Sequence, residues 1–186
     1  MAAIASGLNF STLSETGIAL DLCNTINTTV NPEYPALPFA LGTETIGLDG
    51  SHWIYASPAG AYAIGTVGYF NTAWTFTAIT TTLASGISGV TMGVMSQVAS
   101  VTASPTSTNY DGVWVQVSGL CPAILGAAST SAYAQLYTYT AAGEMNSSSA
   151  GSAVAINGII LTTAVGSGAA ANAVGLLNFP ELSLTT

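Results

Sequence analysis

The chain has 186 residues, with eight acidic side chains, one histidine, no lysine and no arginine, and its formal net charge is −8. Nucleic-acid binding depends on cations that displace the counterions condensed on phosphates, so direct binding of DNA or RNA is excluded. A phosphate-binding loop needs its lysine and an anionic membrane surface needs a basic patch, so nucleotide chemistry and membrane binding are not expected either.

The near absence of charge predicts association with other subunits. Charged residues make up 4% of the chain, against about 25% in an ordinary soluble domain. Freely diffusing proteins keep mixed charge on their surface, so a chain that omits it is expected to cover much of that surface against neighbours. We therefore predict a subunit of a larger assembly. The alternative is a monomer kept in solution by Ser, Thr, Asn and Gly and by repulsion among its acidic groups.

Residues 1–47 are predicted to form an extended, proline-containing arm. Pro32, Pro35 and Pro38 fall within the run NPEYPALP, and proline at this spacing prevents a helix and removes donors from a strand ladder. We expect the arm to run over the surface, where it is a candidate for reaching a neighbouring subunit. Its earlier part, residues 4–22, can supply a short helical turn or one strand.

No secretory signal is expected at the start of the chain, because Met1–Leu20 has no cation before its apolar residues and carries Glu15. Synthesis in a reducing cytoplasm follows, so Cys23 and Cys121 are predicted to be separate buried thiols, although pairing between them stays open. Without secretion, the three N-x-S/T sequons have no expected role; they begin at Asn9, Asn27 and Asn146.

Residues 48–186 are predicted to form one β-rich domain, since a chain of this length can bury one substantial core. Short runs that alternate with a period of two lie between Gly, Ser, Thr, Asn and Asp, most clearly at 53–55, 113–117 and 133–139. In the last run one face carries Tyr133, Gln135, Tyr137 and Tyr139, and the other Ala134, Leu136 and Thr138. The fold class is therefore all-β: a compact β-barrel or β-sandwich of short antiparallel strands.

Two further segments are apolar enough to be considered as helices. Leu83–Val98 contains three glycines, each of which costs a helix interior about 1 kcal/mol relative to alanine, so we predict loop and strand there. The most apolar stretch, Ala153–Val165, is interrupted by Asn157, Gly158 and two threonines. It is too short and too polar to cross a membrane as a helix, and no membrane anchor is predicted.

A weak internal repeat is visible around two Asp-Gly pairs. Asp49-Gly50 precedes Trp53, and Asp111-Gly112 precedes Trp114. If each pair is a turn that begins a Trp-bearing strand, the domain contains a duplicated hairpin. The alternative is that two common turns coincide.

The residues that carry chemistry form no recognisable catalytic or metal site. Asp49, Ser51 and His52 are nearly adjacent, and neighbours in one turn cannot easily align a nucleophile, a base and an orienting carboxylate. No GxSxG elbow is present, and no motif joins Cys23 or Cys121 to His52. We predict a protein that is not an enzyme, with no catalytic residue.

Metal and cofactor sites are not predicted either. One histidine and two widely separated cysteines disfavour zinc. Asp49 or Asp111 can hold calcium with turn carbonyls, but the spaced acidic ligands of an EF-hand loop are missing, and a turn explains each Asp-Gly pair better.

The run ALGTETIGLDGSHWIYASPAGAYAIGTVGYF, residues 40–70, resembles the opening of tailed-bacteriophage virion proteins that decorate or cement the capsid. The matching elements are Leu41-Gly42-Thr43, Asp49-Gly50, Trp53-Ile54-Tyr55-Ala56, and Ala63-Ile64-Gly65 with Gly68. The later order of DGVWVQVSG, a Tyr-rich strand, AAG at 141–143 and INGIILTTA at 156–164 is also similar. The resemblance covers roughly residues 40–180.

This resemblance implies a small all-β virion protein that binds the outside of a phage capsid in many copies. Such proteins often form trimers at local threefold positions and clamp neighbouring copies of the major capsid protein, and none of their residues is catalytic. They usually carry basic residues, which this chain lacks, so charge pairs that use its own cations are ruled out. The expected location is the capsid surface of the virion, after synthesis in the host cytoplasm.

The alternative function is a tail, fibre or cell-surface subunit that binds carbohydrate. Trp53, Trp74 and Trp114, with nearby tyrosines, would supply the aromatic faces that suit sugars. Large aromatic residues also dominate β-protein cores, so three core tryptophans are the competing interpretation. A hydrolase is the least favoured class, because bases and motifs are missing.

Overall fold

The computed structural model describes residues 20, 24–27, 37–87, 89–95 and 109–183. Within them the chain forms eleven strands and a single one-turn helix. The first six strands are β1 (Asn24–Asn27), β2 (Glu44–Ile46), β3 (His52–Pro58), β4 (Val67–Phe70), β5 (Thr75–Ala78) and β6 (Met92–Met95). The others are β7 (Asn109–Gly126), β8 (Leu136–Thr138), β9 (Met145–Asn146), β10 (Ala155–Leu161) and β11 (Ala171–Leu182), and the helix α1 is Thr81–Ala84. The predicted all-β fold class is confirmed.

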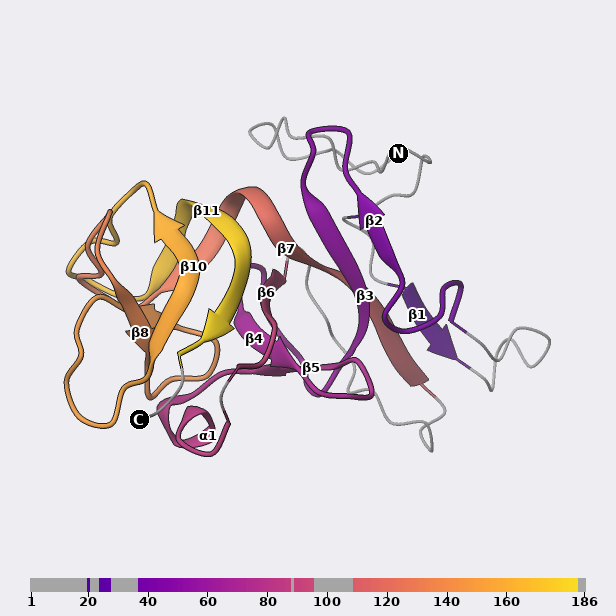
Figure 1. The fold of residues 1–186 in the computed structure, drawn as a ribbon, viewed down its shortest axis with the longest axis horizontal. Helices are drawn as coiled ribbons and strands as arrows, with labels where there is room; N and C mark the ends of the chain where they lie inside the picture. The colour runs from indigo at the N-terminus through magenta and orange to yellow at the C-terminus, as the bar shows by residue number, and fades with distance from the viewer. Residues whose placement is uncertain (1–19, 21–23, 28–36, 88, 96–108, 184–186) are drawn as a thin grey trace.

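The strands close into two small barrels that share β7 (Figure 1). In the first barrel β3 pairs with β7, β7 with β6, β6 with β4, β4 with β5, and β5 returns to β3. In the second barrel β7 pairs with β11, β11 with β10, β10 with β8, β8 with β9, and β9 returns to β7. The sequence left barrel and sandwich open, and the pairings decide for barrels.

Two details differ from the expected short antiparallel strands. β7 has 18 residues, which lets its first half belong to one barrel and its second half to the other. The β3–β5 and β7–β9 pairings are parallel, so the sheet is mixed.

Each barrel has its own apolar core. The first-barrel core takes buried residues from all five of its strands: Ile54, Ala56, Phe70, Phe76, Met95, Val113, Val115 and Val117. The second-barrel core includes Cys121, Ile124, Leu136, Met145, Ile156, Ile159, Leu161, Ala173, Leu177 and Leu182. Val67 of β4 and Val94 of β6 belong to this second core as well. β4 and β6 therefore contribute to both cores and pack the two barrels together.

A bulge in β7 assigns its two faces to different interiors. The register changes from Trp53 opposite Gln116 to His52 opposite Ser118, so Val117 is the extra residue. Two residues further on, Gly119 has φ +99°, a conformation that favours glycine. As a result, the face of β7 that lines the first barrel lies outside the second barrel.

A third apolar cluster covers the side of β3 and β7 that points away from the first-barrel core. Tyr55 and Trp114 lie opposite each other on β3 and β7, with ring centroids 5.0 Å apart. Phe39 packs against both rings at 5.3 Å, and Leu20 is fully buried in the same cluster. β3 is consequently buried on both faces, where its sequence alternation alone suggested a half-buried strand.

The described end of the predicted arm belongs to the first-barrel side of the molecule. β2 pairs with β3, and the Gly42 N–H donates to the Tyr55 carbonyl. β1 pairs with the first residues of β7. The rest of residues 1–36, including Pro32 and Pro35, lies outside the described residues, so the arm and its boundary at residue 47 stay predictions.

The duplicated hairpin is wrong in its second half. Asp49-Gly50 lies in the tight connection between β2 and β3, as expected. Asp111-Gly112 instead lies inside β7, where its backbone pairs with β1. A side chain at Gly112 would collide with the Tyr55 hydroxyl, so this glycine makes room for an aromatic ring and forms no turn.

The remaining local predictions agree with the structure. In Leu83–Val98 the predicted loop and strand follow Ala84 and lead into β6, whereas Leu83 and Ala84 themselves end the one-turn helix α1; residues 88 and 96–98 lie outside the described part. In the Tyr-rich run, Leu136 and Thr138 are buried while Gln135 and Tyr139 are exposed, which confirms the alternation.

Candidate interaction surface

Asp49, Ser51 and His52, which are nearly adjacent in the sequence, are not aligned as a catalytic triad. Asp49 and Ser51 instead form hydrogen bonds that stabilise the turn. The Ser51 hydroxyl donates to Asp49 Oδ1 and accepts from Trp53 Nε1 at 2.6 Å. The Ser51 N–H also donates to Asp49 Oδ1, at 3.0 Å. Ser51 is buried, and its only proton is used by the carboxylate. These bonds fix the β2–β3 turn against the indole.

His52 faces a different partner. Its ring lies edge-on to Phe179 of β11, with centroids 5.3 Å apart. Its cross-strand neighbours are Ile46 on β2 and Ser118 on β7. The imidazole therefore joins strands of the two barrels at their outer surface.

Cys121 is a free, buried thiol in the second-barrel core. Burial raises its pKa from 9.0 to about 12, although a backbone hydrogen bond at Ala123 opposes the shift. A thiol that stays protonated at neutral pH is a poor nucleophile and metal ligand. The predicted separate buried thiol is confirmed for Cys121, whereas Cys23 lies outside the described residues.

The tryptophans are not available as a sugar-binding face. Trp53 and Trp114 are buried in the third apolar cluster, which confirms the core interpretation for these two. Trp74 is partly buried and packs against Phe70, with ring centroids 6.1 Å apart. A carbohydrate site built from all three tryptophans is therefore wrong.

The described residues contain no group of three or more His, Cys, Asp and Glu side chains that could hold a metal ion. The Oδ1 atom of Asp49, one of the two calcium candidates, already accepts two hydrogen bonds from Ser51. No helix in the described part of the chain is long and apolar enough to cross a membrane.

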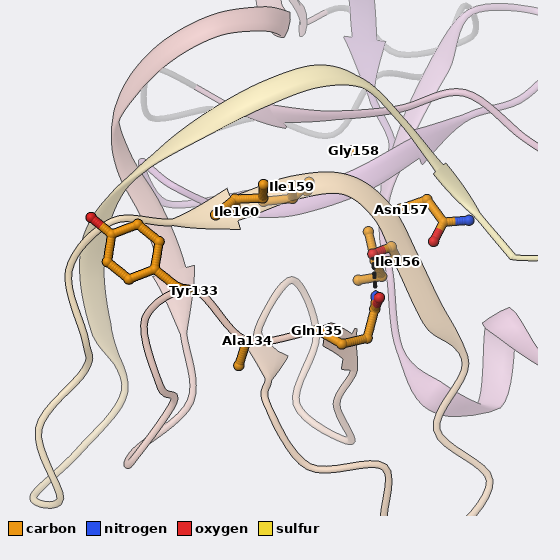
Figure 2. A pocket seen from close by; sticks show the side chains of 8 residues that line it. All are labelled: Tyr133, Ala134, Gln135, Ile156, Asn157, Gly158, Ile159 and Ile160. Atoms are coloured by element: carbon orange, nitrogen blue, oxygen red, sulfur yellow. Dashed lines mark hydrogen bonds between the residues drawn. The ribbon is translucent and has the colours of Figure 1, made fainter.

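Two hollows of about 360 Å³ lie on the second barrel. The first lies between β10 and residues 133–135, and Figure 2 shows Tyr133 and Ile160 at one end and Asn157 at the other. Its Gln135 amide donates to the Leu136 and Ile156 carbonyls, at 3.0 and 2.8 Å. This hydrogen-bonding capacity is used within the protein.

The second hollow is lined by small polar residues that are similarly occupied. Asn146 Oδ1 and Ser148 Oγ each accept a backbone N–H two residues ahead. Thr138 Oγ1 accepts the Val154 N–H at 3.0 Å. No carboxylate, imidazole or thiol lines this hollow or the first, so neither has the groups of a catalytic site.

The most distinctive surface is the outside of the second barrel where β7, β11 and β10 run side by side. Leu120, Leu176 and Ile160 lie directly opposite one another across these strands, and directly paired residues point to the same face. Leu176 is 47% exposed and Ile160 is 48% exposed. The three aliphatic side chains form a row on the surface.

The same face continues onto the first barrel. One step along the strands, Asn178, Ser118, His52 and Ile46 pair in turn across β11, β7, β3 and β2. Phe179, which is 54% exposed, packs edge-on against the His52 ring. We call the surface made by Ile46, His52, Leu120, Ile160, Leu176 and Phe179 the outer face. It crosses five strands and both barrels.

Comparison of the chain with protein-family models, with curated proteins and with solved structures found no match.

The outer face was not predicted from the sequence. Period-two alternation is the signal that could have revealed it, since Ile159, Leu161 and Leu177 point inward while Ile160 and Leu176 point outward. Register irregularities interrupt this alternation in both β10 and β11, and the sequence gives no direct sign of them.

Proposed function

We propose that this chain is a structural subunit of a larger assembly, and specifically a cement or decoration protein on the outside of a virus capsid. The observation that carries the proposal is the outer face, a row of half-exposed aliphatic and aromatic side chains on paired strands. A contiguous exposed apolar surface of this kind marks an interaction site in soluble proteins.

The composition supports the same conclusion. With 4% charged residues and no cation, the surface has little charge to oppose association. The proposal gives the chain no catalytic activity, because Ser51 is hydrogen-bonded to Asp49 and Trp53 and the Cys121 thiol is buried. A nucleic-acid partner is excluded by the missing cations.

The capsid as partner comes from the sequence resemblance to phage decoration proteins. In this role the protein binds the assembled shell better than free capsid subunits, and so stabilises the particle by mass action. One bound copy at a free concentration of 100 Kd contributes about 2.7 kcal/mol. Many copies would add over the shell. Because the phage decoration proteins that the sequence resembles often form trimers, we propose a trimer here as well.

The test is a mass determination of the purified protein, alone and after mixing with undecorated shells. The expected result is a discrete oligomer that binds shells stoichiometrically and raises their resistance to heat. A free monomer that does not bind shells would reject the proposal. A discrete oligomer that ignores shells would favour a tail or fibre subunit instead.

A further inference from the structure

Acidic residues border the outer face at its first-barrel end and beside Phe179. Glu44 lies two residues before Ile46 on the same strand, so both point to the same side of β2. Asp49 lies in the turn after β2, and Glu181 follows Phe179 by two residues on β11. All three are exposed. The outer face thus combines an aliphatic row on β10, β11 and β7 with a border of carboxylates at its β2 end and beside Phe179.

The charge inventory decides what kind of partner fits this border. The chain contains no lysine or arginine, so no side chain of those types can pair with these carboxylates from within the molecule. A second copy would bring the same carboxylates against them, and like charges placed face to face disfavour association. A partner that supplies lysine or arginine turns the same border into favourable pairs.

We propose that the outer face is the docking surface for a protein whose contact region has apolar side chains bordered by lysine or arginine. This proposal rests on the proposed function for the identity of the partner. If the chain is a capsid cement protein, the partner is the outer surface of the capsid. Contacts between copies of this chain use other surfaces.

The two parts of the face have different roles in binding. Ile160, Leu176 and Leu120 form the aliphatic row at its second-barrel end, where contact with a partner excludes water and most binding energy is gained. The carboxylates lie at the edge, where charge pairs set orientation and association rate and are screened by salt. Binding should therefore weaken with salt without being abolished.

The experiment measures binding of matched variants to undecorated shells by sedimentation. Leu176→Ser removes an exposed aliphatic side chain from the outer face. Leu83→Ser is its control, because Leu83 is similarly exposed, at 42%, but lies on α1. The double variant Glu44→Gln with Glu181→Gln removes two border charges, and Glu144→Gln removes one charge away from the outer face.

We expect Leu176→Ser to raise Kd about fivefold to tenfold, since it deletes a half-exposed leucine from the middle of the aliphatic row. The double Gln variant should raise Kd about threefold at low salt, with a smaller difference at about 0.5 M salt. Both controls should bind as the unchanged protein does. Equal binding by the outer-face variants and their controls would overturn the proposal while leaving the cement function intact.

Two further results separate this proposal from the proposed function. If Leu176→Ser changes the mass of the free protein, the outer face is a contact between copies and the proposal is wrong. If the unchanged protein does not bind shells, the cement function fails, and the same variants are compared on a resin of alkyl chains ending in ammonium groups. Earlier elution of the outer-face variants than of their controls would then support the docking chemistry, and equal elution would overturn it.

Discussion

The sharing of β7 predicts that the two barrels unfold as one unit, and Leu136→Ala tests this. Leu136 is fully buried in the second-barrel core. Replacing a buried leucine by alanine costs about 2–5 kcal/mol, the range depending on how far the cavity collapses. Taking about 3 kcal/mol and a urea dependence of about 2 kcal/mol per M, the midpoint of unfolding should fall by about 1.5 M.

The tryptophans allow a direct measurement of coupling between the barrels. All three belong to the first-barrel side of the molecule: Trp53 and Trp114 in the third apolar cluster, and Trp74 against the first-barrel core. Tryptophan fluorescence therefore follows the first barrel, whereas far-ultraviolet circular dichroism follows strands of both. Because β7 crosses both cores, Leu136→Ala should move the two transitions by the same amount.

The control is Ile160→Ala, a change in the same barrel at a half-exposed position. Surface changes usually stay within about 0.5 kcal/mol, so the midpoint should move by less than about 0.3 M. If Leu136→Ala splits the circular dichroism transition and leaves the fluorescence midpoint unchanged, the barrels unfold independently, and the argument from the shared strand is refuted.

Three further perturbations have defined outcomes. Ser51→Ala should lower stability by about 1–3 kcal/mol in thermal unfolding, because it removes the acceptor of a buried indole N–H. Cys121 should resist alkylation at pH 8 in the folded protein and react once the protein is unfolded, because its folded pKa is about 12. Since that pKa lies above the unfolded value of 9.0, the contribution of this thiol to stability is complete below pH 9 and is lost as the pH rises toward 12. Gly68→Ala should destabilise by about 1–3 kcal/mol, because its new methyl group would collide with the Thr77 carbonyl and lie 2.6 Å from the Phe76 ring.

Each of these experiments has a matched control. Ser85→Ala removes a serine hydroxyl that bonds one exposed backbone carbonyl, so a loss equal to that of Ser51→Ala would contradict the indole argument. The alkylation is done in a Cys23→Ser background, and rapid labelling of the folded protein would show that Cys121 is accessible. Gly166→Ala adds a methyl group where nothing lies within 4 Å, and an effect as large as that of Gly68→Ala would remove the steric explanation.

The sequence predicted the local features that depend on short-range chemistry. The strand at Trp53, the turn at Asp49-Gly50 and the loop and strand that follow Ala84 all depend on neighbouring residues, and the structure has each of them. The alternation between exposed Gln135 and buried Leu136 follows from the same periodicity. These predictions succeeded because strand period and turn propensity act over a few residues.

The failures concern residues whose environment is set by distant strands. Asp111-Gly112 has the composition of a turn, but the Tyr55 hydroxyl occupies the space beside Gly112. Trp114 has the aromatic face of a sugar site, but Tyr55 and Phe39 cover it. Neither contact can be recognised from the neighbours of these residues in the sequence.

By itself, the sequence determined the net charge of the chain and the all-β fold class, and it located strands around Trp53, within 113–117 and around Leu136. Only the tertiary structure decided that the strands form two barrels around β7, and that Leu120, Leu176 and Ile160 meet on one outer face. The physical reason is that charge and strand period are properties of the chain, whereas pairing partners depend on contacts between residues far apart in the sequence. The bulge at Val117 decides which face of β7 is inside and which is outside.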